Sequence, residues 1–398
     1  MRILVLHNRY QHPGGEDAVV QAEVALLRDN GHTVHLHEAD NQSIEGQIEA
    51  FRAALSCVWS FSAARDVRTK ILQYHPDIVH VHNFFPRLSP SVHFSSVRCG
   101  VPVVQTLHNY RLLCPASTLS RDGRVCEDCL NKMYPWPAIT HECYHHSRMA
   151  SGALANMIFI HRVCATLNTS VSGFIALSEF ARAKFIAAGL PGDRVTVKPN
   201  FVNSRSAMGD GKGKYALFVG RLAAEKGIGV LLKAWTKLNN DLSLLIAGDG
   251  PLASQINEGT AAHRSIQWLG WRSQKEVSAL MEKAKVLILP SLWYEGFPLV
   301  VVEAFAAGLP VIASRIGTLA EVVTDRRTGL LFPPGNADDL AQAVNWSLAH
   351  PSELEAMRFE ARREFDTKYT PKVNYEKLMR IYRSVCHDFH KRPDAVSV

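Results

Sequence analysis

The sequence lacks any long hydrophobic run. No stretch approaches the roughly 20 apolar residues that a membrane-spanning helix needs, and the nearest candidate covers only residues 152–160. The apolar start of the chain, residues 1–6, is too short for the hydrophobic part of a secretory signal and predicts a buried strand. We therefore expect a cytoplasmic protein, either soluble or bound peripherally to the inner face of a membrane.

The sequence also lacks a concentrated excess of one charge. Its 398 residues carry 44 Lys and Arg against 37 Asp and Glu, which gives a net charge of +7 without a basic tail. Such a balance fits anionic substrates or an anionic membrane surface. Nucleic-acid-binding proteins usually carry their cations in a clustered stripe, so we expect no nucleic-acid partner.

The eight cysteines are expected to be reduced or metal-bound, because disulfides are rare in the cytoplasm. The spacing Cys126-x-x-Cys129 lets one turn offer two thiolates to a zinc ion. Cys114 and Cys143 flank this pair and complete a four-cysteine structural zinc site on a long loop. Buried, reduced cysteines are the other interpretation, and both stay open.

Strand-like and helix-length segments alternate through both halves of the chain. Strands are expected over 3–6, 33–36, 78–81, 101–106, 174–177, 215–219, 242–247, 266–269, 286–289, 311–313 and 329–332. Helices are expected over 16–28, 178–188, 229–238, 275–282, 298–307 and 337–349. This alternation predicts parallel sheets covered on both faces. A polar, glycine-rich stretch over 203–214 indicates the linker between two α/β domains.

Two carboxylates, Glu295 and Glu303, lie eight residues apart on either side of an expected helix start. Pro298 suits the first helical turn, and Gly308 with Pro310 indicates the end of the helix. The helix N-terminus between the carboxylates offers free backbone N–H groups, which suit a phosphate. Glu303 interrupts an apolar run, so we expect it to be buried and to need a partner.

Arg221 and Lys226 follow the strand-like run over 215–219 and lie five residues apart. Ligands of open α/β sheets bind beyond the carboxyl ends of strands. The sequence contains no Asp-x-Asp motif that would hold a metal-bound diphosphate, so the two cations would neutralise the diphosphate themselves. We therefore expect catalysis without a metal. Two solvated surface cations are the alternative interpretation.

Two further features mark strand ends in the first half. Gly14 and Gly15 lie between the first strand and an amphipathic helix, where glycine lets the backbone approach a ligand. A plain turn is the alternative. His108 directly follows the strand-like run over 103–107. His82 also lies at a strand end, where it either approaches the acceptor or has a structural role.

The Glu-x7-Glu element, with Gly296-Phe297-Pro298 after the first Glu, resembles the donor-site signature of the retaining glycosyltransferases of family 4. The resemblance covers most of the chain and implies the GT-B fold, an α/β fold with two doubly wound, Rossmann-like domains facing across a cleft. The acceptor-side domain would then cover 1–202 and the nucleotide-sugar domain 203–371. A final helix over 372–390 would pack back on the first domain.

The resemblance also implies residue roles. Glu303 would accept from the ribose hydroxyls and Glu295 from hydroxyls of the sugar, while His108 would touch the donor sugar. The residue after His108 is Asn109, where many relatives have Asp. Catalytic roles fall to His108, Glu295, Arg221 and Lys226. The implied donor contacts are Gly14, Gly15, Arg221, Lys226, Arg272, Glu295, Gly296, Phe297, Leu299 and Glu303.

The resemblance points to a bacterial polysaccharide-type enzyme. It would move a hexosyl group from a nucleotide-diphosphate sugar to a saccharide or lipid-linked acceptor. A nucleotide-sugar epimerase of the same fold is one alternative, and a zinc-stabilised nucleic-acid-binding protein is another. Release of nucleoside diphosphate that depends on an added acceptor indicates a transferase. An epimerase would interconvert sugars without an acceptor, and a nucleic-acid-binding protein would be retained on nucleic acid in a salt-dependent manner.

Overall fold

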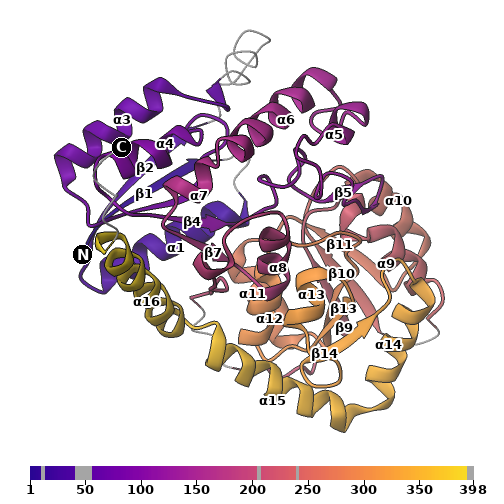
Figure 1. The fold of residues 1–398 in the computed structure, drawn as a ribbon. Helices are drawn as coiled ribbons and strands as arrows, with labels where there is room; N and C mark the ends of the chain where they lie inside the picture. Colours follow the sequence, from indigo (N-terminus) through magenta and orange to yellow (C-terminus); the bar gives the residue numbers. More distant parts are fainter. Residues whose placement is uncertain (10–13, 41–55, 204–207, 239–241, 392–398) are drawn as a thin grey trace. The chain divides into compact units, whose positions relative to one another are not determined.

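The computed structural model describes residues 1–398 apart from 10–13, 41–55, 204–207, 239–241 and 392–398. The chain divides into two compact units, each built around a six-stranded parallel sheet (Figure 1). The first unit comprises Met1–Leu119, Glu127–Asn200 and the chain from Asn374 onwards, and the second comprises Ser120–Cys126 and Phe201–Val373. Within the described residues, no helix has both the length and the hydrophobicity needed to cross a membrane.

The first unit has the strand order β2-β1-β3-β4-β7-β8. Its strands are β1 (Arg2–Arg9), β2 (Thr33–Asp40), β3 (Ile78–Asn83), β4 (Val103–Leu107), β7 (Gly173–Ala176) and β8 (Val195–Val197). Its helices are α1 (Gly15–Asp29), α3 (Phe61–Tyr74), α4 (Ser91–Arg98), α5 (Pro137–Thr140), α6 (Arg148–Val163), α7 (Thr166–Ser170), α8 (Glu179–Ala187), the short η1 (Gly192–Arg194) and α16 (Pro371–His390).

Alternate residues of β1 enter two separate cores of the first unit, as a strand covered on both faces requires. Leu4 and Leu6 pack with side chains from α3, α4 and α6 on one face. Ile3 and Val5 pack with α1 and α16 on the other face. The last helix of the chain therefore completes the core of the first unit, where it buries residues at helical spacing, such as Leu378 and Tyr382.

The second unit has the strand order β11-β10-β9-β12-β13-β14. Its strands are β9 (Tyr215–Val219), β10 (Ser243–Ala247), β11 (Ile266–Gly270), β12 (Val286–Leu289), β13 (Val311–Ser314) and β14 (Gly329–Phe332). A two-stranded ribbon, β5 (Ser120–Arg121) and β6 (Arg124–Val125), also belongs to this unit. Its helices are η2 (Ala224–Lys226), α9 (Ile228–Trp235), α10 (Ala253–Ala262), α11 (Gln274–Lys283), α12 (Leu299–Ala306), α13 (Gly317–Val322), α14 (Ala337–Ala349) and α15 (Pro351–Lys368).

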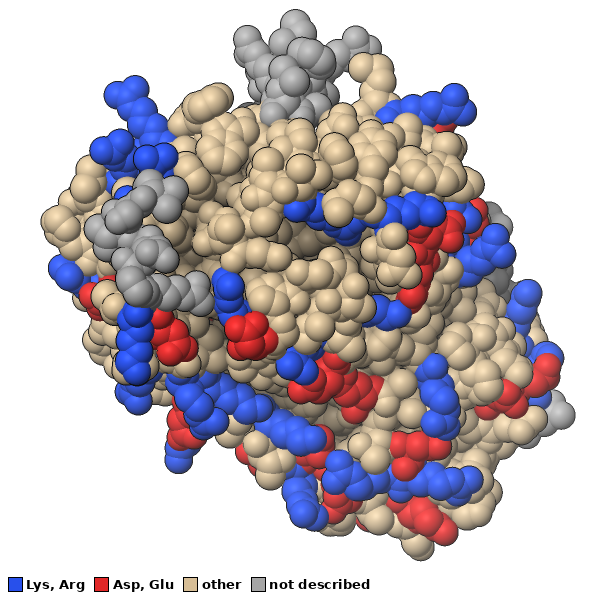
Figure 2. Space-filling view, viewed as in Figure 1, with Lys and Arg blue, Asp and Glu red and all other residues tan. Residues whose placement is uncertain are grey.

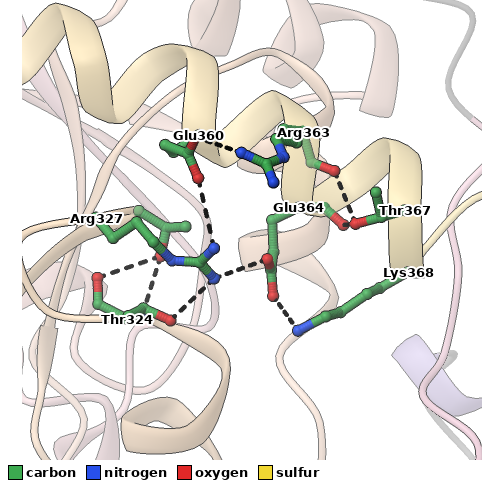
Figure 3. A network of polar contacts seen from close by, with 8 residues as sticks. Thr324, Arg327, Glu360, Arg363, Glu364, Thr367 and Lys368 are labelled. Atoms are coloured by element: carbon green, nitrogen blue, oxygen red, sulfur yellow. Dashed lines mark hydrogen bonds and ion pairs between the residues drawn. The ribbon is translucent and has the colours of Figure 1, made fainter.

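Helix α15 is a charged helix fastened to the second unit. Arg327, from the turn before β14, reaches Glu364 at 2.9 Å and Glu360 at 3.4 Å, and Lys368 also pairs with Glu364 (Figure 3). Cations and carboxylates are interleaved along this helix (Figure 2). The apolar side of the same helix, including Ala361 and Phe365, packs on the core behind α12.

Both sheets contain a point at which the strand order reverses, and this point fixes where a ligand can bind. In the second unit β9 lies between β10 and β12, and in the first unit β1 lies between β2 and β3. Loops leaving neighbouring strands in opposite directions open a crevice at such a point, beyond the carboxyl ends of the strands. The loops after β9 and β12 contain the expected cations and carboxylates of the second unit.

Several of the expected boundaries need correction. The chain enters the second unit at Phe201, and Ser120–Cys126 also belongs to that unit, so residues 120–126 and 201–202, which were expected in the first domain, lie in the second unit. Pro298 is the N-cap of α12 instead of its first residue, because its ψ of 93° is not helical. The expected strand over 101–106 begins only at Val103, since Val101 and Pro102 precede the ladder.

Candidate functional site

The loop after β9 is packed tightly against the loop after β12. Gly227, at the end of η2, has φ of 73°, and a Cβ placed there would lie 1.8 Å from the carbonyl oxygen of Pro290. Only glycine fits both this backbone conformation and this approach. In addition, the N–H of Leu292 donates to the carbonyl of Glu225 at 2.8 Å. These contacts bring Lys226 beside the β12 loop.

Lys226 and Glu295 form an ion pair at this edge of the sheet. The Lys226 Nζ donates to both carboxylate oxygens of Glu295, at 2.7 and 2.9 Å, and the Ser291 hydroxyl donates to Oε1 at 2.8 Å. The same ammonium lies 5.5 Å from the centre of the Trp293 ring. Burial alone would raise the pKa of Glu295, but Lys226 and the hydrogen bonds hold it below its usual value. The carboxylate is therefore ionised at neutral pH.

Arg221 lies two residues after β9 and its side chain is exposed. Among the described residues, no carboxylate forms an ion pair with its guanidinium. The structure therefore joins Lys226 to Glu295 and leaves Arg221 as a cation at the same strand end that can meet an anion.

The start of α12 lies between the two predicted carboxylates. The first intrahelical bond of the helix runs from the Val301 N–H to the Pro298 carbonyl at 3.0 Å, so the amides of Leu299 and Val300 precede it. Phe297 contacts the Tyr369 ring, with the ring centres 6.1 Å apart, and the Gly296 carbonyl accepts from Thr318 at 3.5 Å. The segment between Glu295 and the helix is thus fixed from two sides.

Glu303 is half-buried in the second turn of α12, not fully buried as expected. Burial raises the pKa of its carboxyl, and a hydrogen bond with Gln274 only partly offsets this effect. Gln274 is the first residue of α11 and follows Arg272 by two residues. Arg272 itself lies 3.8 Å from Glu276, and among the described residues it forms no ion pair or hydrogen bond with Glu295 or Lys226.

Gly14 and Gly15 form the start of α1 in the first unit, and both are exposed. The N–H of Gly14 donates to the Asp17 carboxylate at 2.8 Å, and Asp17 lies 2.9 Å from the buried His7. A Cβ at Gly14 would have no atom within 4 Å. Packing therefore does not require glycine there. Pro13, part of the same expected loop, lies outside the described residues.

His108 follows β4 directly and is half-buried. Its Nε2 lies 2.9 Å from Nδ1 of His82, and the two rings are stacked. Burial and the neighbouring imidazole hold the pKa of His108 well below its usual value, so the ring is neutral at neutral pH. Such a ring can act in hydrogen bonds but not as a fixed positive charge.

Sequence reasoning missed the partners of these residues. Ser291, Trp293 and Gln274 carry no motif, and their roles come from the folding of separate segments. Glu23 did leave a signal. It occupies a position in the apolar stripe of α1 beside Val20 and Val24, where a charge must find a buried partner.

The structure does not gather the four predicted cysteine ligands into a preformed site. Among the described residues, one group of three potential ligands has its ligand atoms within 4.8 Å of one another, and it consists of Glu23, His80 and His82. Cys114 and Cys129 are buried, whereas Cys126 and Cys143 are half-buried. Structural zinc at these cysteines stays a prediction from their spacing.

Two family models match the chain. Residues 13–205 match the model described as Glycosyltransferase Family 4, and residues 203–364 match glycosyl transferases group 1. The uncharacterized glycosyltransferase MJ1178 of Methanocaldococcus jannaschii is 34% identical over 180 residues, which is 45% of this chain and 50% of that protein. A 2-deoxystreptamine N-acetyl-D-glucosaminyltransferase of Niallia circulans is 30% identical over 43% of this chain and 45% of its own length. The chain thus spans about half the length of these curated relatives.

Solved structures show the same fold. Anabaena Alr3699/HepE in complex with UDP superposes with a TM-score of 0.69 and 18% identity, over 96% of this chain and all of that one. At this identity the likeness concerns the fold alone, which is GT-B, with two Rossmann-like parallel sheets.

Proposed function

The chain belongs to the family 4-type glycosyltransferases of GT-B fold, and from this premise we propose that it transfers a hexosyl group from a nucleoside diphosphate sugar to an acceptor hydroxyl with retention of configuration. One observation carries the proposal. An ionised carboxylate, Glu295, and a cation, Lys226, are held 2.7 Å apart where the order of the second sheet reverses. The sugar of such a donor presents hydroxyl groups beside the diphosphate anion. Glu295 can accept hydrogen bonds from the hydroxyl groups, and Lys226 can bind the diphosphate.

In the proposed reaction Lys226 exchanges its contact with Glu295 for the donor diphosphate. Arg221 and the amides at the start of α12 add to the same anion site. The bond between the anomeric carbon and the diphosphate oxygen breaks, and its electron pair leaves with the diphosphate. The acceptor oxygen bonds to the anomeric carbon on the same face, and its proton passes to the departing phosphate oxygen. Glu295, released from Lys226, accepts from the sugar hydroxyls.

Glu303 is proposed to hold the ribose. Its carboxylate lies on the helix that follows the anion site, and its raised pKa reflects an incompletely satisfied, half-buried charge. Two ribose hydroxyls would supply the hydrogen bonds that Gln274 alone does not provide. The turn that contains Arg272 would then lie beside the base.

The acceptor is proposed to be a lipid-linked saccharide of surface polysaccharide synthesis, used at the inner face of a membrane. A pocket of about 480 Å³ in the first unit supports this proposal. Its walls are largely apolar, with Leu112, Met157 and Ile158 among them, and Lys132 and Arg162 border it. This combination suits an apolar chain next to a phosphate. Exposed apolar side chains on α6 and in the segment before it, including Met133 and Met149, add to the apolar surface.

The reaction is tested by release of nucleoside diphosphate with and without a lipid-linked saccharide. UDP-sugars are the first donors to try. We expect release that depends on the acceptor, and a product with the anomeric configuration of the donor by NMR. Interconversion of the donor sugar without an acceptor would contradict a transferase and indicate an epimerase. Thermal shifts with a panel of nucleoside diphosphates identify the base independently, because ligands that bind the folded state raise the melting temperature.

We further propose that the cations make a catalytic metal unnecessary. Chelator treatment should leave the rate of sugar transfer unchanged, whereas Arg221→Ala should lower kcat by roughly 100-fold, the scale for loss of one electrostatic stabiliser. Arg363→Ala, which removes an exposed guanidinium on α15, is the matched control. Unchanged turnover in Arg221→Ala would remove Arg221 from the mechanism.

A further inference from the structure

A buried polar cluster lies behind His108 in the first unit. Glu23 of α1, His80 and His82 of β3, and Lys198 after β8 are each no more than 3% exposed. Glu23 contacts Lys198 at 2.7 Å and both imidazoles at 3.3 Å. His82 in turn reaches His108 at 2.9 Å. An unbroken path of polar contacts therefore runs from a buried carboxylate to the half-buried histidine.

The carboxylate at the inner end of this path is ionised. Burial alone would raise the pKa of Glu23, but Lys198 and the two imidazoles hold it well below its usual value. Lys198 is itself fixed by the Asn374 side chain of α16, at 3.2 Å. Glu23 and Lys198 thus form a buried ion pair. The ionised Glu23 carboxylate can only accept hydrogen bonds.

This arrangement fixes which ring nitrogen carries the proton in His82 and in His108. Burial lowers the pKa of His82 to about 3, so its ring is neutral and has a single N–H. Its Nε2 lies 3.3 Å from an oxygen of the Glu23 carboxylate, and a lone pair there would face a negative charge, so we place the proton on Nε2. Its Nδ1 must then accept from Nε2 of His108. Nδ1 of His108 keeps its lone pair, and no described side chain donates to it.

We propose that Glu23 and His82 are positioning residues that fix His108 as its Nε2–H tautomer, so that Nδ1 accepts a hydrogen bond from a hydroxyl of the donor sugar. This inference rests on the proposed function. A lone pair facing the sugar also favours the positive charge that develops at the anomeric carbon, whereas an N–H would oppose it. The other tautomer would turn a lone pair of Nε2 toward His82, so His82 would have to carry its proton on Nδ1 and face the Glu23 carboxylate with a lone pair on Nε2.

The tautomer is measured in the free protein by NMR of histidine labelled with ¹³C and ¹⁵N, with the His108 signals assigned by their loss in His108→Gln. We expect the Nε2–H tautomer in the wild-type protein. His82→Phe removes the acceptor and should give His108 a mixture of tautomers. His161→Phe is the matched control, because His161 is also buried with both ring nitrogens hydrogen-bonded, and it lies outside the cluster. This control should leave the His108 signals unchanged.

Kinetics supply the second readout. His82→Phe should lower kcat by roughly 10- to 100-fold, the range for loss of a supporting partner, with nucleoside diphosphate affinity unchanged. His82→Asn offers an amide oxygen near the former Nδ1, so it should restore part of the tautomer preference and of kcat, and it serves if His82→Phe does not fold. A wild-type His108 protonated on Nδ1, or a folded His82→Phe or His82→Asn whose His108 signals and kcat match the wild type, would overturn the inference. Absence of any transfer activity would instead contradict the proposed function, since the NMR readout needs no substrate.

Discussion

At the scale of single residues, the two carboxylates of the second unit differ because their surroundings differ. Glu295 has a cation and a hydroxyl as partners, and its pKa lies below the usual value. Glu303 has one amide partner and a raised pKa. One carboxylate is thus preorganised as an anion, whereas the other carries a cost that a bound ribose would relieve.

Glu303→Gln should therefore stabilise the free protein while weakening nucleotide binding. A raised pKa means that the ionised form is disfavoured in the folded state, so removal of the charge raises the melting temperature at neutral pH. The gain should decline as the pH falls through the raised pKa of the folded carboxyl, and it should vanish below the pKa of the unfolded carboxyl, where both states are protonated. Nucleoside diphosphate affinity should fall by about tenfold, the loss of one charge-assisted hydrogen bond. Calorimetric titration and melting curves at several pH values measure both effects, and a variant that melts lower than wild type at pH 7 would contradict the assignment.

Substitutions of two glycines should distinguish a role in donor binding from a role in packing. Gly14→Ala should change the free energy of unfolding by less than about 1 kcal/mol, since nothing meets its Cβ and its φ is −130°. If the loop approaches the donor, the same change lowers kcat/KM by roughly tenfold or more. Gly227→Ala should instead destabilise the fold by roughly 1–3 kcal/mol through its positive φ and its contact with Pro290. Denaturant unfolding together with steady-state kinetics compares the two variants. Full activity in Gly14→Ala would show that the loop around Gly14 is a plain turn without a role in donor binding.

At the scale of elements, the buried parallel strands were the most predictable part of the fold. β9, β12 and β14 match their expected bounds, because each is a short apolar run between turn residues. β8 was not predicted, since Val195–Val197 is too short to show a pattern. The helices between Phe61 and Ser170 were also not predicted, and several are short pieces whose ends depend on tertiary packing.

The candidate site was predictable only as a set of separate positions. Strand ends identified Arg221, Lys226 and Glu295, because the alternating pattern shows where each strand stops. The pairing of Lys226 with Glu295 spans 69 residues and depends on β9 and β12 being neighbours. That adjacency follows from the crossover of the sheet and leaves no mark in the local sequence.

The contact between α15 and the turn before β14 gives a prediction at this scale. Glu364 is nearly buried and shares its charge with Arg327 and Lys368. Arg327→Ala should lower the free energy of unfolding by about 1–2 kcal/mol, because it leaves this carboxylate with one partner fewer. Arg363→Ala removes an exposed ion pair on the same helix and should change the free energy of unfolding by less than about 0.5 kcal/mol. Equal effects in chemical denaturation would mean that the Arg327 contacts do not fasten α15.

At the scale of the whole molecule, the chain crosses between the two units four times, and the last two crossings follow Asn200 and precede Asn374. These crossings are tied together within the first unit. The Asn374 amide donates to the Pro199 carbonyl at 2.7 Å, and its oxygen accepts from Lys198. The same Lys198 balances Glu23 behind His108. The end of the chain thus supports the buried cluster of the first unit as well as its core.

The proposed donor site lies in the second unit, and the central prediction is that Lys226 leaves Glu295 to bind the diphosphate. Calorimetric titration of UDP, or of the nucleoside diphosphate selected by thermal shift, into wild type, Lys226→Gln and Glu295→Gln tests this directly. Lys226→Gln should bind at least roughly tenfold more weakly, since it loses a charge-assisted contact. Glu295→Gln should bind equally well or more tightly, because Lys226 no longer has to give up a carboxylate. Weaker binding in Glu295→Gln together with unchanged binding in Lys226→Gln would contradict the claim.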